Sequence, residues 1–430
     1  MAKSDPTRPV DLLHELLPRS LIRGMARQLG CVQRQREVDA YDLFVAAVLR
    51  TPGREDGSIA AIRDRFIRRT GRTIARSAFW SRFSKAFALL VAWCVQHLVS
   101  KAETELPKLT GLMASFADVI AADATVVTVH EALSDVWPGT RHPAATKVHT
   151  RVRATSGELL RRRITGERVA DCDAFGVTWE DAGKLFLLDR GYSSASLWWR
   201  IHRVGGFFVT RLPASHKPTI ERSLRKHRGR ARSLEGKKLW DVLDGLRRTV
   251  VEVVCPFRIH VNRYGGKKRG RYERAEFRVV GLWNAKDRRH HVYVTNVPSE
   301  WFPAEVLRDV YRLRWEVETF YKTAKSGLGL KGLTTTKRHI VEALIDSALL
   351  RASIAMQARK VAARWLPKSR WIGLLRWVKV WREVVDELLT TTRGHASTLT
   401  WRRLAHIAMD PNRKRPPTWW RLTDGHAGGT

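Results

Sequence analysis

The stretch VIAADATVVTV, residues 119–129, decides the fold class of this chain. It is rich in β-branched residues and has the length of one buried strand. Asp123 interrupts the apolar run, where a strand buries most of its neighbours on both faces, and an ionised carboxylate is rarely left there without a partner. We therefore expect Asp123 either to be a core residue bonded to backbone or arginine, or to serve a functional site.

Further strands follow this stretch. ATKVHTRVRAT (145–155) alternates in polarity, LFLLDRGY (185–192) is a short apolar run that ends in a turn, and GGFFVTRL (205–212) is another strand pattern. Between the last two, residues 193–205 have a helical pattern, so the region is α/β. Asp189 stands at the carboxyl end of its strand, where α/β sheets place their ligands, although an aspartate there also suits a simple turn.

A helix pattern, YRLRWEVETFYKTAK (311–325), supplies a third acidic candidate. At about 100° per residue, Tyr311, Arg314, Glu318 and Lys325 fall within an arc of roughly 60° on one face. Glu316 falls about 160° from Glu318, away from the two cations. Glu318 is therefore the candidate for chemistry. An ordinary amphipathic helix with an Arg–Glu pair one turn apart explains the same spacing.

The composition predicts a polyanionic partner. The 430 residues include 78 Lys and Arg against 42 Asp and Glu, a net charge of +36 that repels itself unless something neutralises it. Nucleic acid is the first candidate. A membrane is the rival, but the longest apolar run, residues 86–99, is too short to span a bilayer and is better interpreted as a core helix.

Cysteine usage and the N-terminus both favour a reducing cytoplasm. The cysteines, Cys31, Cys94, Cys172 and Cys255, lie far apart, which supports neither a metal knuckle nor a local disulfide framework. The first residues lack the apolar segment and cleavage site of a secretory signal. Together with the charge, this predicts a cytoplasmic, nucleoid-associated protein.

The chain divides into five predicted segments. These are a helical DNA-binding domain (1–106), the first part of a catalytic core (112–213), a β-rich basic insertion (214–291), the second part of the core (292–365) and a C-terminal helical region with its tail (366–430). In the first segment two helices are joined by a turn at Gly71. Its many arginines suit either contact with DNA or the solvated face of a helical bundle.

The insertion has two cationic stretches that we expect at hairpin tips. Arg228 and Arg230 belong to the first, and Lys267, Lys268 and Arg269 to the second. Solvated loops are the simpler explanation. However, so much like charge at two tips is costly unless phosphates lie nearby, so these residues are predicted DNA contacts.

Three carboxylates on separate elements suggest metal chemistry. Asp123, Asp189 and Glu318 could converge on two Mg²⁺ or Mn²⁺ ions, which prefer hard oxygen ligands. Two such ions about 4 Å apart would drive an in-line displacement at phosphorus. Arg314 and Lys325 would then meet phosphate oxygens. Tyr311 and Arg190 are further candidates for phosphate contact.

The order of these motifs resembles the DDE transposases of bacterial insertion sequences. Asp123 in DATVV, Asp189 in DRGY and the spacing Y-x2-R-x3-E-x6-K are similar to the family named after insertion sequence four. The resemblance implies a ribonuclease H-like α/β core, a mixed five-stranded sheet with helices, interrupted by a β-rich insertion and flanked by N- and C-terminal helical regions. It places Asp123 on the first strand, Asp189 after the fourth, and Glu318 on a later helix.

The same resemblance implies a reaction. It is cut-and-paste transposition at terminal inverted repeats of double-stranded DNA, with metal-dependent cleavage, a hairpin intermediate and strand transfer into target DNA by a synapsed homodimer. A hairpin requires a base to leave the stack, and Trp240, Trp283 and Trp301 are candidates to hold it, although packing is the better explanation for each. Two alternatives stay open: a metal-dependent nuclease without strand transfer, and an inactive DNA-binding relative.

Overall fold

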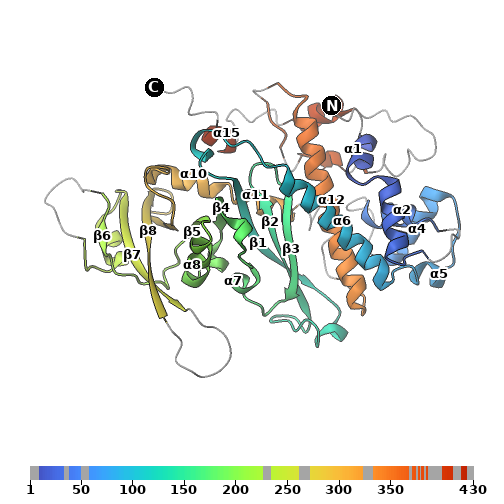
Figure 1. Cartoon of the computed structure of the whole chain (residues 1–430), viewed down its shortest axis with the longest axis horizontal. Helices are drawn as coiled ribbons and strands as arrows, with labels where there is room; N and C mark the ends of the chain where they lie inside the picture. Colours follow the sequence, from blue (N-terminus) through green and yellow to red (C-terminus); the bar gives the residue numbers. More distant parts are fainter. Residues whose placement is uncertain are drawn as a thin grey trace.

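The structure of the protein is a computed structural model that describes most of the chain. The described residues are 9–32, 38–49, 58–225, 234–260, 272–322, 333–367, 370–373, 376–377, 379–381, 384–385, 400–409 and 418–423. Figure 1 shows the N-terminal helices at one end of the molecule and β6, β7 and β8 at the other, with the central sheet between them.

The N-terminal region is helical, as the sequence predicts. Ser58 caps the fourth helix by accepting a hydrogen bond from Ala61 N at 3.2 Å. Gly71 ends that helix in the left-handed conformation, φ 71°, which confirms the turn predicted there. The helices are α1 (Pro9–Leu16), α2 (Arg19–Gln28), α3 (Ala40–Val48), α4 (Ile59–Thr70), α5 (Arg76–Trp80) and α6 (Lys85–Thr104).

One continuous sheet organises the rest of the described chain. Its spatial order is β3-β2-β1-β4-β5-β9-β8-β7-β6. The strands are β1 (Asp118–Thr128), β2 (Ala145–Arg153), β3 (Leu159–Gly166), β4 (Lys184–Leu188), β5 (Phe207–Arg211), β6 (Arg222–Ser223), β7 (Val251–His260), β8 (Tyr272–Asn284) and β9 (Arg289–Thr295).

The sheet is mixed, but it has more strands than the five we predicted. Strand β1 runs antiparallel to β2 and parallel to β4, and β4 runs parallel to β5. Strand β9 then pairs antiparallel with β5 through Val209, Thr210 and Arg211, so β6 to β9 extend the same sheet. Strand β9, which runs from the end of the predicted insertion into the second part of the core, therefore pairs with the edge of β5, and the insertion strands β6 to β8 continue the same sheet.

Two apolar cores cover the two faces of the sheet. On one face, β1 and β4 contribute Val119, Ala121 and Leu187 to a core shared with the N-terminal helices and with α12 (Arg338–Ala363). On the other, Ile120 and Leu188 pack with α8 (Ala195–Arg203) and α9 (Leu239–Gly245). The predicted core helix at 86–99 lies in α6, which contacts α12 and β3.

The expected single helix over 311–325 is wrong, because the chain breaks after Arg312. Helix α10 (Leu307–Arg312) ends there, and α11 (Trp315–Lys322) begins three residues later. Hydrogen bonds from Leu313 N to Val310 O (3.0 Å) and from Arg314 N to Tyr311 O (3.1 Å) tighten the connection into a 3₁₀ turn. The arc computed at 100° per residue therefore does not extend across the break.

Shorter elements connect the strands, and helices close the described chain. They are η1 (Gly111–Met113), η2 (Glu131–Leu133), α7 (Asp171–Ala174), η3 (Trp179–Asp181), η4 (Arg190–Tyr192), η5 (Ala304–Val306), α14 (Trp401–Ala408) and α15 (Thr418–Thr423).

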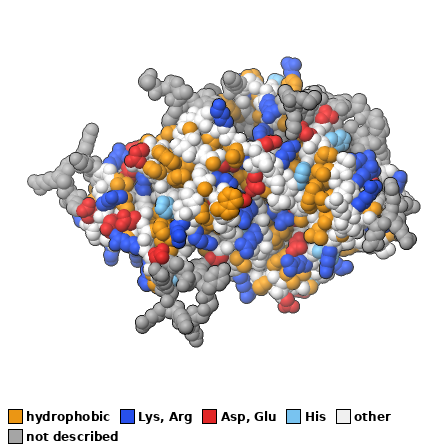
Figure 2. Space-filling model, in the orientation of Figure 1, with side chains coloured by type: hydrophobic (Ala, Val, Ile, Leu, Met, Phe, Trp, Pro, Cys, Tyr) orange, Lys and Arg blue, Asp and Glu red, His pale blue; other side chains and the backbone are white. Residues whose placement is uncertain are grey.

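None of the helices in the described part combines the length and apolarity that a bilayer crossing requires. Figure 2 shows Lys and Arg side chains over much of one face.

Candidate active site

Asp123 lies on β1 at the end of the pairing between β1 and β4. The last paired residues of the two strands are Ala122 and Leu188, so Asp123 and Asp189 are the next residue of each strand. Because the strands are parallel, the two carboxylates leave the same edge of the sheet. The Asp123 side chain is half-buried, and its Oδ1 accepts a hydrogen bond from Ala124 N at 2.7 Å.

Asp189 begins the turn that follows β4. It caps η4, and its Oδ1 accepts a hydrogen bond from Gly191 N at 2.7 Å. Gly191 is not among the glycines with a left-handed backbone, so it is required here for space and not for its φ angle. Gly191, in the turn that ends LFLLDRGY, leaves room for the neighbouring carboxylates.

The two aspartates are electrostatically coupled. Burial, and after it repulsion by Asp189, raises the pKa of Asp123 to about 7. Burial also raises the pKa of Asp189 above its ordinary value, against the opposing effects of the Gly191 amide and the Arg314 guanidinium. Burial thus raises the pKa of both half-buried carboxylates, and a bound cation would stabilise their ionised forms.

The third predicted carboxylate, Glu318, lies on α11 and forms an ion pair with Arg314. Their side chains are 26% and 12% exposed, so the pair is only partly screened by solvent. Arg314 lowers and Glu318 raises the pKa of Asp123, which puts both residues within electrostatic range of that carboxylate. The Arg314 guanidinium also lies 5.5 Å from the centre of the Tyr311 ring.

The carboxylates do not form a closed metal cage as the side chains stand. Among the described residues, no group of three or more His, Cys, Asp and Glu side chains is placed to hold a metal ion. Asp123 and Asp189 act on each other, whereas Glu318 is engaged by Arg314. A three-carboxylate site therefore needs Glu318 to exchange its arginine partner for a cation.

Tyr321 connects α11 to the strand that carries Asp123, a role that sequence reasoning missed. Its hydroxyl lies 2.7 Å from Val148 O, 3.2 Å from Asp123 O and 2.9 Å from Thr150 Oγ1, which donates to it. The side chain is buried, so these bonds are made away from water. The sequence shows only a tyrosine on an apolar helix face, because its partners lie more than 170 residues away.

Two arginine-lined cavities share Arg190 and Arg211. The one that Asp189 also lines has a volume of about 410 Å³, and the other, toward the insertion, about 600 Å³. The first is lined by Asp189, Arg190, Arg211, Asn284, His291, Tyr293, Arg308, Tyr311, Arg312, Arg314 and Trp315. The predicted residues Arg190, Tyr311 and Arg314 thus meet at one surface, and Arg211 and Arg308 join them although their strand and helix patterns gave no signal.

Of the three tryptophans predicted as base-holding candidates, two line the larger cavity. Trp240 donates a hydrogen bond from Nε1 to His216 O at 2.6 Å, and Trp283 meets the His290 ring edge-on at 5.3 Å. Trp301 instead packs against Phe116 and Phe207.

The remaining predicted DNA contacts lie outside the described residues. They are Lys325 on the helix, Arg228 and Arg230 in the first cationic stretch, and Lys267, Lys268 and Arg269 in the second. The backbone of Glu316 is part of α11, but its side chain is not described, so its separation from Glu318 stays a prediction.

Comparison with known protein families assigns the chain to one family. Residues 114–351 match the family model described as the transposase DDE domain, a span that includes Asp123, Asp189 and Glu318. The chain belongs to the transposase DDE domain family. It is therefore a DNA transposase of the insertion-sequence type, and membership in this family implies a dependence on divalent metal ions in general.

Individual relatives agree with this assignment. The transposase for insertion sequence element IS231E of Bacillus thuringiensis subsp. finitimus is 24% identical over 371 residues, which cover 79% of this chain and 77% of the relative. The putative transposase InsL for insertion sequence element IS186A of Escherichia coli (strain K12) is 34% identical over 79 residues, 18% of this chain and 21% of the relative.

A solved structure is also similar. It is a cryo-EM structure of the piggyBac transposase synaptic complex with hairpin DNA, 8% identical, covering 94% of this chain and 86% of that one. Its TM-score of 0.47 is too low for a shared fold to follow from it.

Proposed function

We propose that this DDE transposase moves an insertion sequence by a cut-and-paste reaction, in which it cleaves the strands at terminal inverted repeats, forms a hairpin on the element's ends and transfers them into target DNA. The observation that carries the proposal is the meeting of Asp123 and Asp189 at one edge of the sheet, with Glu318 and Arg314 within electrostatic range. A charge of +36 supplies the attraction for the DNA backbone.

The side chains present suit divalent cations. Asp123 and Asp189 offer hard oxygen ligands whose mutual repulsion a cation would relieve, and Glu318 is the third ligand once it leaves Arg314. When bound, two Mg²⁺ or Mn²⁺ ions activate a water or a 3′-hydroxyl and stabilise the leaving oxygen of a displacement at phosphorus. Asp123 must be ionised to take part, so the free energy of binding includes removal of its proton.

The cations of this chain position the DNA. Arg314, released from Glu318, contacts a non-bridging phosphate oxygen, and Tyr311 beside it donates a hydrogen bond to another. Arg190 and Arg211 line both cavities and are suited to a strand that passes from the carboxylates toward the insertion. Lys325 and the cationic stretches of the insertion, with Lys267, Lys268, Arg269, Arg228 and Arg230, are proposed as further contacts to DNA phosphates.

The larger cavity suits a base that has left the stack during hairpin formation. Trp240 and Trp283 supply flat surfaces beside the arginines of its wall. Arg248 and Arg288 line the same cavity with positive φ, 61° and 51°, and they are the two non-glycine residues with that backbone among those described. Such strained positions cluster at functional sites.

We also propose that the core is ribonuclease H-like and that the protein belongs with the family named after insertion sequence four. The order β3-β2-β1-β4-β5 with only β2 antiparallel to its neighbours supports the first, and the Tyr311, Arg314 and Glu318 spacing supports the second. The protein works as a synapsed homodimer in the cytoplasm, at the nucleoid. Residues 1–106 recognise the inverted repeats.

One assay tests the proposal. The protein is incubated with a duplex that bears its element's end and a supercoiled target, with and without Mg²⁺. Metal-dependent joined products support transposition. Nicks without joining identify a nuclease, and a salt-sensitive mobility shift without cleavage identifies an inactive DNA-binding protein.

A further inference from the structure

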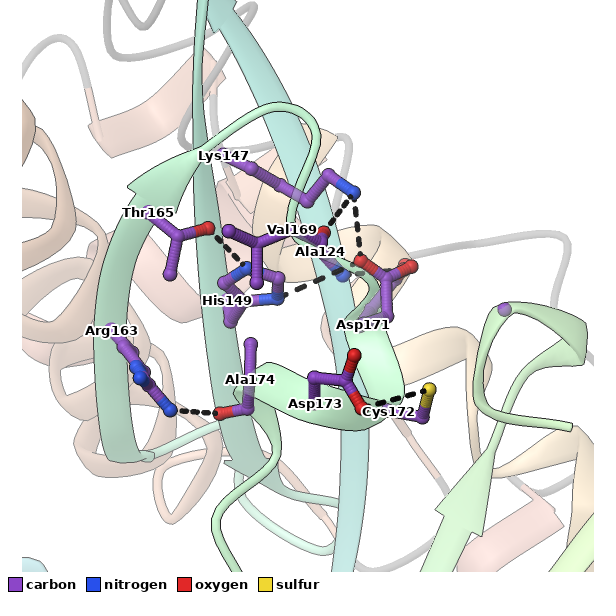
Figure 3. Close-up of polar contacts among 12 residues, drawn as sticks. Ala124, Lys147, His149, Arg163, Thr165, Val169, Asp171, Cys172, Asp173 and Ala174 are labelled. Carbon is purple, nitrogen blue, oxygen red and sulfur yellow. Dashed lines mark hydrogen bonds and ion pairs between the residues drawn. The ribbon is translucent and has the colours of Figure 1, made fainter. Parts of the chain in front are cut away.

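Asp171, the first residue of α7, forms an ion pair with Lys147 of β2 and lies near His149 of the same strand. Lys147 Nζ lies 3.1 Å from Asp171 Oδ1 and also donates a hydrogen bond to Val169 O at 2.9 Å. His149 Nδ1 lies 3.7 Å from the same Asp171 oxygen (Figure 3). The side chains of Asp171, Lys147 and His149 are 23%, 16% and 7% exposed, so the carboxylate has little freedom to move.

The second oxygen of Asp171 faces the turn that carries Asp189. A β-carbon built on Gly191 would lie 2.7 Å from Asp171 Oδ2 and 3.1 Å from Asp189 Oδ1. The two carboxylates therefore flank the α-carbon of Gly191, whose amide is bonded to Asp189. A side chain at this position would therefore displace Asp171, Asp189 or both.

The short helix that presents Asp171 is fastened to the sheet. Arg163 donates a hydrogen bond to Ala174 O at 3.2 Å, as Figure 3 shows, and Arg151 donates to Phe175 O at 2.7 Å. His149 donates or accepts a further bond with Thr165 Oγ1 at 2.9 Å. Asp171 is thus held by the sheet beside the turn that carries Asp189.

Asp171 and Tyr321 approach the sheet from opposite faces. Thr150 pairs with Asp123 and meets Tyr321, whereas His149 pairs with Ala124, so the two neighbours on β2 point to opposite faces. Tyr321 therefore supports the carboxylate edge from one face of the sheet. On the other face of the sheet, Asp171 contacts Lys147 of β2 and lies against Gly191 in the turn after β4.

We propose that Asp171, paired with Lys147, is a positioning residue for Asp189: it packs against Gly191, whose amide holds the Asp189 carboxylate in place for a divalent cation. This inference rests on the proposed function, because it presumes that Asp189 holds the cation. Residues behind a ligand orient it and strengthen the site without touching the metal. Its negative charge adds to the attraction that Asp123 and Asp189 exert.

The test measures Mn²⁺ binding by the purified full chain, without DNA, by calorimetry. Asp171→Asn keeps the shape and removes the charge, and we expect about tenfold weaker Mn²⁺ binding. Asp173→Asn, the same change two residues later at an exposed position of α7, should bind as the wild type does. An unchanged Mn²⁺ affinity in Asp171→Asn overturns the inference.

A second measurement tests the geometry through thermal melting. Gly191→Ala should lower the melting temperature, because the new methyl group meets both carboxylates. Asp171→Ala should relieve much of that loss in the double variant, because the closest obstacle is gone. Equal losses from Gly191→Ala in both backgrounds would overturn the close approach.

The outcomes separate this inference from the proposed function. A wild type that binds Mn²⁺ but neither cuts nor joins DNA refutes the function, while the calorimetry of Asp171→Asn still decides the inference. A wild type that joins DNA while Asp171→Asn shows normal Mn²⁺ affinity refutes the inference alone. A wild type without Mn²⁺ affinity refutes both.

Discussion

The carboxylates at the two ends of β1 differ in the charges that surround them. At the start of the strand, Asp118 accepts a hydrogen bond from Arg153 Nε at 2.9 Å and another from Val119 N at 2.8 Å. Arg153 also pairs with Glu158, which Lys360 and Gln357 contact from α12. Five residues later, the half-buried Asp123 accepts a hydrogen bond from the Ala124 amide and is repelled by Asp189, with Arg314 as a more distant cation.

This difference separates a structural ion pair from a binding site. A buried carboxylate with a cation of its own chain locks elements together, here β1, β2 and α12. An ionised carboxylate that is withdrawn from water beside another carboxylate destabilises the fold until a bound cation neutralises the pair. Variants at the two ends should therefore affect different measurements.

The largest expected effect is on catalysis at the Asp123 end. Asp123→Ala, Asp189→Ala and Glu318→Ala should each reduce cleavage of an end-bearing duplex by at least about a thousandfold, because each removes one of the proposed oxygen ligands of the metal ions. DNA binding, measured by mobility shift, should persist. Glu316→Ala is the matched control, and an equal loss there would contradict the assignment of Glu318.

The next largest effect is on folding at the Asp118 end. Arg153→Ala should lower the free energy of unfolding by about 3–5 kcal/mol, because it leaves the buried Asp118 carboxylate without its cation and removes one of the two cations that contact Glu158. Arg274→Ala removes a surface pair with Glu221 and should cost less than about 1 kcal/mol. Denaturant titration measures both, and similar losses would show that the Asp118 network is not a structural clamp.

Tyr321→Phe should give an intermediate result, because Tyr321 connects the two halves of the site. Loss of its buried hydroxyl should cost about 1–2 kcal/mol of unfolding free energy and lower the cleavage rate about tenfold. Tyr272→Phe, at a position that is 41% exposed, is the control. A wild-type cleavage rate in folded Tyr321→Phe would remove its positioning role.

The smallest effect is a dependence on pH. Because the pKa of Asp123 is about 7 in the folded protein and ordinary when unfolded, the unfolded chain ionises first. Without divalent ions this group should therefore reduce stability as pH rises from about 4 to 7, and the reduction should stay constant above that.

Melting temperatures of the wild type and Asp123→Asn isolate this effect. The variant should melt a few degrees higher at pH 8 and equally at pH 4, and Mg²⁺ should raise only the wild type at pH 8. A wild type that gains stability relative to Asp123→Asn between pH 4 and 7 without metal would reverse the assigned direction.

Much of the site could be predicted because its signals are local. A carboxylate inside a β-branched run and another at the end of an apolar strand identify Asp123 and Asp189 from neighbouring residues. Arg314 and Glu318 pair because four residues separate them within one helical turn. The break between α10 and α11 was missed, since no glycine or proline marks it.

The remaining features depend on which distant segments meet. Asp171 follows β3 with no motif around it, and only the placement of α7 brings it against Gly191. The partners of the Tyr321 hydroxyl lie on β1 and β2, and the extension of the sheet from five to nine strands depends on β9 finding the edge of β5.

The sequence by itself determined the charge that attracts DNA, the strands and helices that carry the three acidic residues, and the spacing of Arg314 and Glu318. These follow from side-chain periodicity and composition, which act over a few residues. Only the tertiary structure decided that Asp118 is neutralised by the chain while Asp123 faces Asp189, because burial and charge pairing depend on contacts between residues far apart in the chain.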